Sequence, residues 1–275
     1  MDEVDLLVHA RAALLDALDA LESHLNSVVI IGAQAIYLRT AGAPVAVAEA
    51  TKDSDLALDP RTLDNDPLLE AAMKAGGFSR NLTTNQPGAW LSSNGIPVDL
   101  MVPEGLAGSG GKSARGARIP PHDRHAARRA SGLEATVIDN EIMTVTALDP
   151  ADHRTREVRV AGTAALVVAK AHKIGERASN TPNRLIDKDA HDLYRILVAT
   201  DTQTLATDIT RLLGEELSRG STIAALDFIH ELFARGPESL GSQMAGRAEE
   251  GLGNPVTVAL QTSILASDLL EALGH

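Results

Sequence analysis

Three aspartates stand among apolar neighbours in the first hundred residues of the chain. Asp53 and Asp55 lie two apart in TKDSDLALD, and Asp99 lies within PVDLMV. Residues two apart on a strand project to the same face, about 7 Å apart along the strand. Like charges at that distance repel each other unless a cation lies between them, and carboxylate oxygens suit Mg²⁺. If the strands adjoin, the three acids predict metal-assisted phosphoryl displacement; the alternative is that they flank strand ends in solvent.

A second group of charged residues lies further along the chain. Lys170, Lys173 and Arg177 recur at steps of three and four, which places them on one stripe of a helix. Asp189 and Asp192 share a helical face in the same way. A cationic stripe can neutralise phosphate charge. The alternative is a solvated helix face with a plain ion-pair network.

The stretch VVIIGAQAIYL, which begins at Val28, is typical of a buried strand, a turn at Gly32 and the start of a helix. The free backbone N–H groups at a helix N-terminus form a natural cradle for phosphate. Without the acids downstream, an ordinary strand-to-helix turn would explain this segment equally well.

These motifs together resemble the polymerase-β-type nucleotidyltransferase superfamily, and more narrowly the AbiEii/MenT-like toxins of bacterial toxin–antitoxin systems. The resemblance spans residues 28–197. It rests on the strand and turn around Gly32 and on a Thr-x-Asp-x-Asp strand at residues 51–55. It also rests on a helical lysine followed by an arginine, and on a Lys-Asp-x-x-Asp-Leu motif; these are Lys170, Arg177 and residues 188–193.

The resemblance implies a role for each matching residue. Asp53 and Asp55 would hold Mg²⁺ on a nucleoside triphosphate, and Asp99 would be a third metal-binding carboxylate that helps to activate the acceptor hydroxyl. Gly32 and Ala33 would line the triphosphate, although the family often has glycine or serine at the position of Ala33. The remaining residues would act from the helices: Lys170 as a phosphate contact, Lys173 and Arg177 beside it, and Asp192 to complete the site.

A basic stretch stands out in a chain whose formal net charge is −12. It contains Lys112, Arg115, Arg118, Arg124, Arg128 and Arg129. We expect these side chains to contact the phosphates of an RNA acceptor, most simply a tRNA; the alternative is a solvated basic loop. His122 and His125 in the same stretch do not predict zinc, because no cysteine or further ligand accompanies them.

The elements that must position these residues fall into two groups. Helices are expected at residues 4–25, 33–42 and 66–77, and strands at 27–32, 53–59, 135–148 and 156–162. A hairpin with a two-residue Asn-Gly turn is expected over residues 88–103. Five helical segments follow, at residues 163–177, 186–199, 202–217, 221–236 and 254–274. The pattern predicts an α+β fold: a mixed-sheet nucleotidyltransferase domain at residues 1–162 and a helical domain at residues 163–275.

Composition limits the possible functions. No apolar run approaches the roughly 18 residues that span a bilayer, and the acidic start MDEVD is unlike a secretion signal. With no cysteine in its 275 residues, the chain has no disulfide framework. A cytoplasmic protein that binds no membrane fits best. The acidic charge argues against a general nucleic-acid coat, and 2% aromatic residues argue against a base-stacking platform.

The expected function is Mg²⁺-dependent transfer of a nucleotide from an NTP to RNA, by the toxin of a toxin–antitoxin pair with a cognate antitoxin as partner. Two alternatives remain open. One is a nucleotidyltransferase that modifies a small molecule such as an antibiotic. The other is a catalytically inactive member that only binds within a toxin–antitoxin pair.

Overall fold

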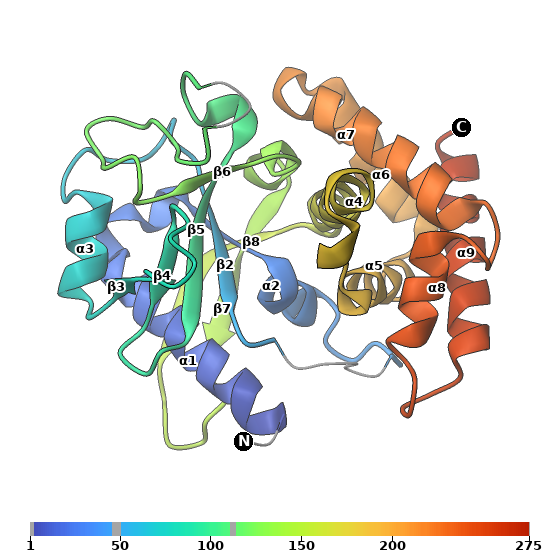
Figure 1. Cartoon of the computed structure of the whole chain (residues 1–275), viewed down its shortest axis with the longest axis horizontal. Coiled ribbons are helices and arrows are strands. Elements are labelled where there is room, and N and C mark those ends of the chain that lie inside the picture. The colour runs from blue at the N-terminus through green and yellow to red at the C-terminus, as the bar shows by residue number, and fades with distance from the viewer. Residues whose placement is uncertain (1–2, 46–50, 111–113, 275) are drawn as a thin grey trace. The chain divides into compact units, whose positions relative to one another are not determined.

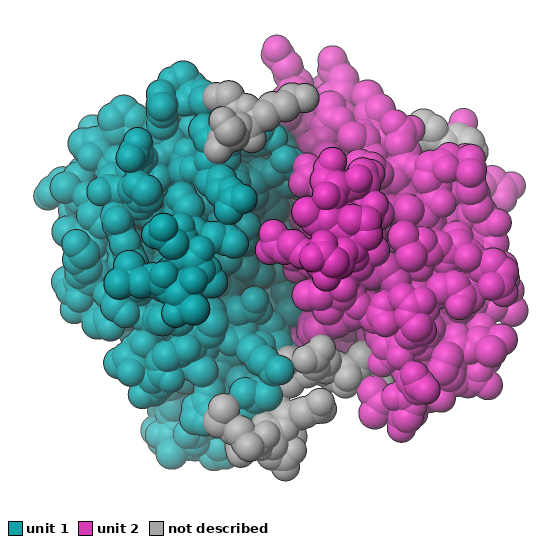
Figure 2. Space-filling view, in the orientation of Figure 1, with its two compact units in different colours: residues 1–35, 50–161 teal, residues 36–49, 162–275 magenta. Residues whose placement is uncertain are grey.

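The chain folds into two compact units, which Figure 2 colours separately. The computed structural model describes residues 3–45, 51–110 and 114–274. Unit 1 comprises residues 1–35 and 50–161, and unit 2 comprises residues 36–49 and 162–275. The segment 36–49 therefore groups with the helical second unit, although it precedes most of the strands.

The described residues of unit 1 form one mixed sheet of eight strands (Figure 1). The strands are β1 (Val28–Ile31), β2 (Ser54–Leu58), β3 (Ser79–Arg80), β4 (Ala89–Leu91), β5 (Pro97–Pro103), β6 (Arg128–Ala130), β7 (Asn140–Thr146) and β8 (Thr155–Ala161). Their order is β3-β4-β5-β2-β1-β8-β7, and β6 pairs with β5. At the centre, β1 runs antiparallel to β2 and parallel to β8. The expected mixed sheet is confirmed.

Helix α1 (Glu3–Ala20) covers one face of this sheet. Its apolar stripe, which includes Leu14, Leu18 and the following Leu21, is fully buried. The hydroxyl of Ser54 on β2 donates to the carbonyl of Ala10 in α1 at 3.0 Å, so Ser54 faces the helix. Because neighbouring residues on a strand point to opposite faces, Asp55 projects away from α1.

Unit 1 also includes α3 (Leu69–Ala75) and the start of α2 (Gly32–Arg39), and two strands of its sheet form a hairpin. Helix α2 follows β1 directly, and α3 contacts α1. Strands β4 and β5 form the expected antiparallel hairpin, with Leu91 opposite Pro97. The connection spans residues 92–96 instead of two, and the N–H of Ser92 donates to the carbonyl of Ile96. Gly95 carries the left-handed turn at a φ of +76°.

Unit 2 is helical in its described residues, as expected for the C-terminal part of the chain. Its helices are α4 (Thr163–Asn180), α5 (Asp187–Ala199), α6 (Thr202–Gly214), α7 (Glu216–Ile229), α8 (Leu240–Arg247) and α9 (Pro255–Ala272). All five expected helical segments are present, and α8 is an additional helix. A π-helical turn (His230–Ala234) interrupts the expected helix at 221–236. None of the described helices is long and apolar enough to cross a membrane.

One arginine explains why the segment after residue 35 belongs to unit 2. The Nε group of Arg195 in α5 donates to Oγ1 of Thr40 at 2.6 Å, and another guanidinium nitrogen donates to the carbonyl of Val45 at 2.7 Å. Arg195 is buried and also lies over the ring of Tyr37. A buried guanidinium with several donors satisfied in this way ties the segment firmly to α5.

A buried histidine predicts that the protein loses stability in mild acid. Nδ1 of His122 accepts the N–H of Leu69, and burial is the main cause that lowers the pKa of this imidazole. The ring therefore takes up a proton at a lower pH in the folded protein than in the unfolded chain, where it does so below about pH 6.5. Stability contributed by this residue is complete above that pH and falls as the pH decreases.

His122→Asn tests this expectation, because the amide oxygen of asparagine can accept the same N–H but does not titrate. Urea midpoints measured at pH 7.5 and pH 5.5 should fall less for the variant than for the wild-type protein. Equal losses in the two proteins would show that other groups govern the acid sensitivity.

Candidate functional site

Two of the expected metal-binding aspartates lie side by side in the sheet. Strand β2 runs parallel to β5, and Asp55 is in register with Asp99. Register partners on adjacent strands, about 4.8 Å apart, project to the same face. Both side chains are partly exposed, on the face opposite α1. The sheet thus holds two carboxylates next to each other among buried apolar residues.

The turn at Gly32 lies directly against Asp55. Ile31, the last residue of β1, is in register with Asp55 on β2. Gly32 has a φ of +65°, and a Cβ atom placed there would lie 2.3 Å from Oδ2 of Asp55. Only glycine allows this backbone conformation so close to the carboxylate. Ala33 follows in the first turn of α2, where backbone N–H groups lack helical partners.

Asp53 occupies a different setting from the one expected. Strand β2 begins at Ser54, so Asp53 precedes it and does not share a strand face with Asp55. Its side chain is exposed, and Oδ1 accepts the hydroxyl of the buried Thr51 at 2.8 Å. Asp53 lies outside the strand because the pairing of β2 with β5 starts at Ser54, which is in register with Val98.

Arg128 is the residue of this site that the sequence did not indicate. Its guanidinium donates to Oδ2 of Asp99 at 2.8 Å, and about one quarter of each side chain is exposed. The sequence placed Arg128 only in the basic stretch. No local pattern could have found its partner, because the contact depends on the parallel pairing of β6 with β5, which sets Arg128 beside Met101.

The chemistry of the donors fits a hard cation. Asp53, Asp55 and Asp99 offer carboxylate oxygens, which Mg²⁺ prefers. Among the residues that the structure describes, however, no three acidic or histidine side chains are grouped closely enough to hold an ion. The Asp55–Asp99 pair is therefore the preformed part of the site, and Asp53 lies two residues away along the chain.

The basic stretch divides into exposed and structural arginines. Arg129 donates to the carbonyls of Ala107, Gly108 and Gly110, and so holds the preceding loop. Arg128 pairs with Asp99, as described above. The arginines that remain exposed are Arg115, Arg118 and Arg124. Lys112 lies outside the described residues.

The charged residues expected on helices form a network within unit 2. Nζ of Lys170 in α4 donates to Asp189 at 2.8 Å and to Asp192 at 2.7 Å, both in α5. Further cations surround the two carboxylates: Lys173 and Arg177 donate to Asp189, and Lys188 donates to Asp192. Four cations thus share two aspartates.

Burial distinguishes this network from a surface ion pair. Lys170, Asp189 and Asp192 are buried, while the side chain of Lys173 is 40% exposed. Burial alone would lower the pKa of Lys170, but the two carboxylates outweigh it and raise the pKa above its ordinary value. Burial would likewise raise the pKa of Asp189, and the adjacent cations instead hold it well below the usual range. The cations likewise lower the pKa of Asp192, so Lys170, Asp189 and Asp192 are all charged at neutral pH.

The expected site residues are thus collected into two groups. Gly32, Ala33, Asp55 and Asp99 meet in unit 1, with Asp53 nearby in the chain. Lys170, Lys173, Arg177 and Asp192 meet in unit 2. Tyr37 also contacts the second group, since Nζ of Lys188 lies 5.3 Å from the centre of its ring. Because Tyr37 and Lys188 lie far apart in the sequence, no local pattern predicts this contact.

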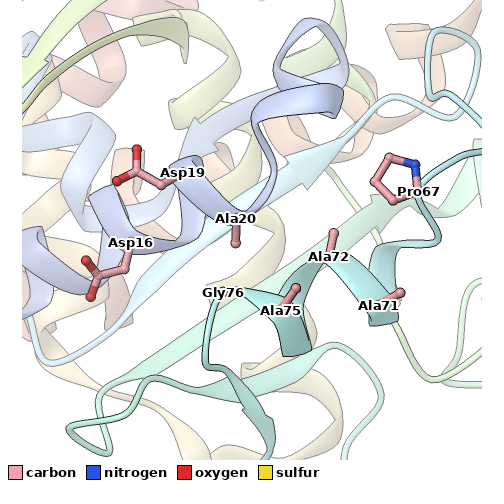
Figure 3. Close-up of a pocket in the computed structure, with 8 residues that line it drawn as sticks. All are labelled: Asp16, Asp19, Ala20, Pro67, Ala71, Ala72, Ala75 and Gly76. Carbon is pink, nitrogen blue, oxygen red and sulfur yellow. The ribbon is translucent and has the colours of Figure 1, made fainter.

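A groove on unit 1 is separate from the aspartate pair. It has a volume of about 640 Å³ and lies between α1 and α3, with Ala72 and Ala75 on one wall (Figure 3). Asp16 and Asp19 on the other wall are paired with Arg154. Because α1 covers the face of the sheet opposite Asp55, this groove does not lead to the candidate site.

Comparison with known proteins adds little to this site. No family model and no curated protein matches the chain. A solved structure from H. pylori, described on provisional grounds as a nucleotidyltransferase, is 10% identical in sequence. The similarity covers 98% of this chain and 96% of that one, with a TM-score of 0.34.

Proposed function

We propose that this protein is a Mg²⁺-dependent nucleotidyltransferase that transfers a nucleotide from an NTP to an acceptor hydroxyl. One observation carries the proposal. Asp55 and Asp99 are register partners on parallel strands, and Gly32, at a positive φ, brings the start of α2 against Asp55. Paired carboxylates beside a helix N-terminus would combine a cation site with a phosphate cradle.

Asp53, Asp55 and Asp99 would hold the metal ion in this proposal. When bound, Mg²⁺ would neutralise the triphosphate and stabilise charge that develops during transfer. The backbone at Gly32 and Ala33 would approach the phosphates, because no Cβ atom blocks the turn at Gly32. The phosphate-binding and catalytic roles of Lys170, Lys173, Arg177 and Asp192 rest on the family resemblance.

The acceptor is proposed to be RNA, most simply a tRNA. Arg115, Arg118 and Arg124 are exposed in a protein of net charge −12, so an RNA backbone would have to bind at such a local patch. We further propose that the protein inhibits growth as the toxin of a toxin–antitoxin pair, with a cognate antitoxin as its partner.

Removing the three exposed arginines should weaken RNA binding. Arg115→Gln, Arg118→Gln and Arg124→Gln together should lower tRNA affinity and reduce the slope of log affinity against log salt by about 1 for each phosphate that the variant no longer neutralises. The matched control is a triple glutamine variant at the exposed Arg184, Arg211 and Arg235. Equal slopes for the two triple variants would remove the patch from the proposed acceptor site.

Incorporation of labelled NTP into total tRNA, with and without Mg²⁺, tests the whole proposal. Label in tRNA that requires Mg²⁺ would support it. Label only in a small acceptor such as an aminoglycoside would favour the small-molecule enzyme. No turnover with either acceptor by a folded protein would favour the inactive binding member.

A further inference from the structure

Arg128 has a fixed backbone and an incompletely satisfied side chain. Its main chain is held on one side by the register with Met101 on β5 and on the other by a bridge to Gly116. The guanidinium donates to Asp99, but its Nε group is buried without a hydrogen-bond partner in the described part of the chain. The side chain thus retains a donor for a second acceptor.

The position of Arg128 makes it a competitor for the proposed cation. In the metal-free protein, its positive charge offsets the carboxylate of Asp99, which lies beside that of Asp55. A divalent ion on the same carboxylates would repel the guanidinium and take up the oxygen that Arg128 now contacts. A guanidinium released there would be next to the triphosphate, and its planar fork matches phosphate oxygens well.

We propose that Arg128 exchanges Asp99 for a phosphate oxygen when the cation and its triphosphate occupy the site. This inference rests on the proposed function and assigns Arg128 to nucleotide binding, apart from the exposed arginines of the RNA patch. Arg129 next to it also has a buried Nε group without an identified partner, but it serves as a contrast because its guanidinium donates to loop carbonyls and not to a carboxylate of the site.

The exchange predicts effects of opposite sign in two titrations of the full-length protein. Titration with Mn²⁺ alone, followed by the electron paramagnetic resonance signal of the free ion, should give about three- to fivefold tighter binding for Arg128→Gln, since the competing ion pair is removed. Titration with preformed Mn²⁺–tripolyphosphate, followed by calorimetry, should give about tenfold weaker binding for the same variant, since a charge-assisted hydrogen bond is removed.

Two further variants separate this exchange from a structural role. Arg128→Lys keeps the charge and should return the affinity for Mn²⁺ alone toward the wild-type value. Arg61→Gln removes another arginine of unit 1, one paired with Asp59 at 2.8 Å, and should change neither affinity. Affinity shifts of the same sign in both titrations, or no shift in either, would overturn the exchange. If the wild-type protein still bound Mn²⁺ in that case, the proposed metal site would stand. If neither the wild-type protein nor Arg128→Gln bound Mn²⁺, the proposed metal site would fall as well.

Discussion

Asp55→Asn should reduce Mg²⁺-dependent nucleotidyl transfer by about 10³-fold or more, the equivalent of several kcal/mol of lost transition-state stabilisation. The amide has the size of the carboxylate but lacks the charge that holds the ion. Asp55 is the residue most central to the site, since it is in register with both Ile31 and Asp99 and lies against Gly32. The measurement is single-turnover incorporation of labelled NTP into tRNA.

The same substitution should leave the fold intact. The amide keeps the size of the side chain and an oxygen that can accept hydrogen bonds, so the free energy of unfolding in metal-free buffer should change by no more than about 1 kcal/mol. Asp59→Asn is the matched control, because Asp59 follows the same strand but pairs with Arg61. Near-normal transfer by Asp55→Asn, or an equal loss with Asp59→Asn, would show that the metal site has been placed wrongly.

Lys170→Met should destabilise unit 2 by about 3–5 kcal/mol, the usual cost of breaking a buried ion pair on one side. The substitution leaves Asp189 and Asp192 buried with fewer cations, although Lys173, Arg177 and Lys188 remain nearby. The loss of the buried cation that lies between the two carboxylates, and not the loss of packing, accounts for most of the expected effect. Urea unfolding monitored by circular dichroism measures it.

Two comparisons make this expectation specific to the buried position. Lys173→Met removes a cation from the same network, but at a side chain that is 40% exposed, and should cost less than about 1 kcal/mol. Combining Lys170→Met with Asp189→Asn and Asp192→Asn should restore part of the stability, because the two most deeply buried negative charges are removed together with the ammonium group, and the cations that remain are more exposed. If the Lys170→Met protein were as stable as the wild type, the role of Lys170 would be to bind a ligand and not to stabilise unit 2.

Most helices and central strands of this protein could be predicted from local patterns. The leucine spacing of α1 and the β-branched run of β1 show their buried faces directly. The sequence did not indicate α8 or β6. β6 is only three residues long, and its pairing with β5 depends on the path of the whole preceding loop. Short elements held by distant partners carry little local signal.

The candidate site was predictable in its residue types but not in its contacts. Asp55, Asp99 and Gly32 were singled out because a carboxylate among apolar strand residues is costly to bury without a partner, and because a strand, a glycine turn and a helix start precede the first acids. Asp53 was expected on the same strand face as Asp55, and it precedes the strand instead. Lys170 was expected to contact phosphate, and in the structure its ammonium group contacts Asp189 and Asp192.

The amino-acid sequence by itself determined which elements form and which chemical groups they carry, because helix and strand periodicity depends on neighbours within a few residues. Only the tertiary structure decided which groups meet. Asp99 and Arg128 are 29 residues apart, and Lys170 and Asp192 are 22 apart. Such pairings follow from the packing free energy of a whole unit, in which each buried charge must find a partner, and no local pattern records that result.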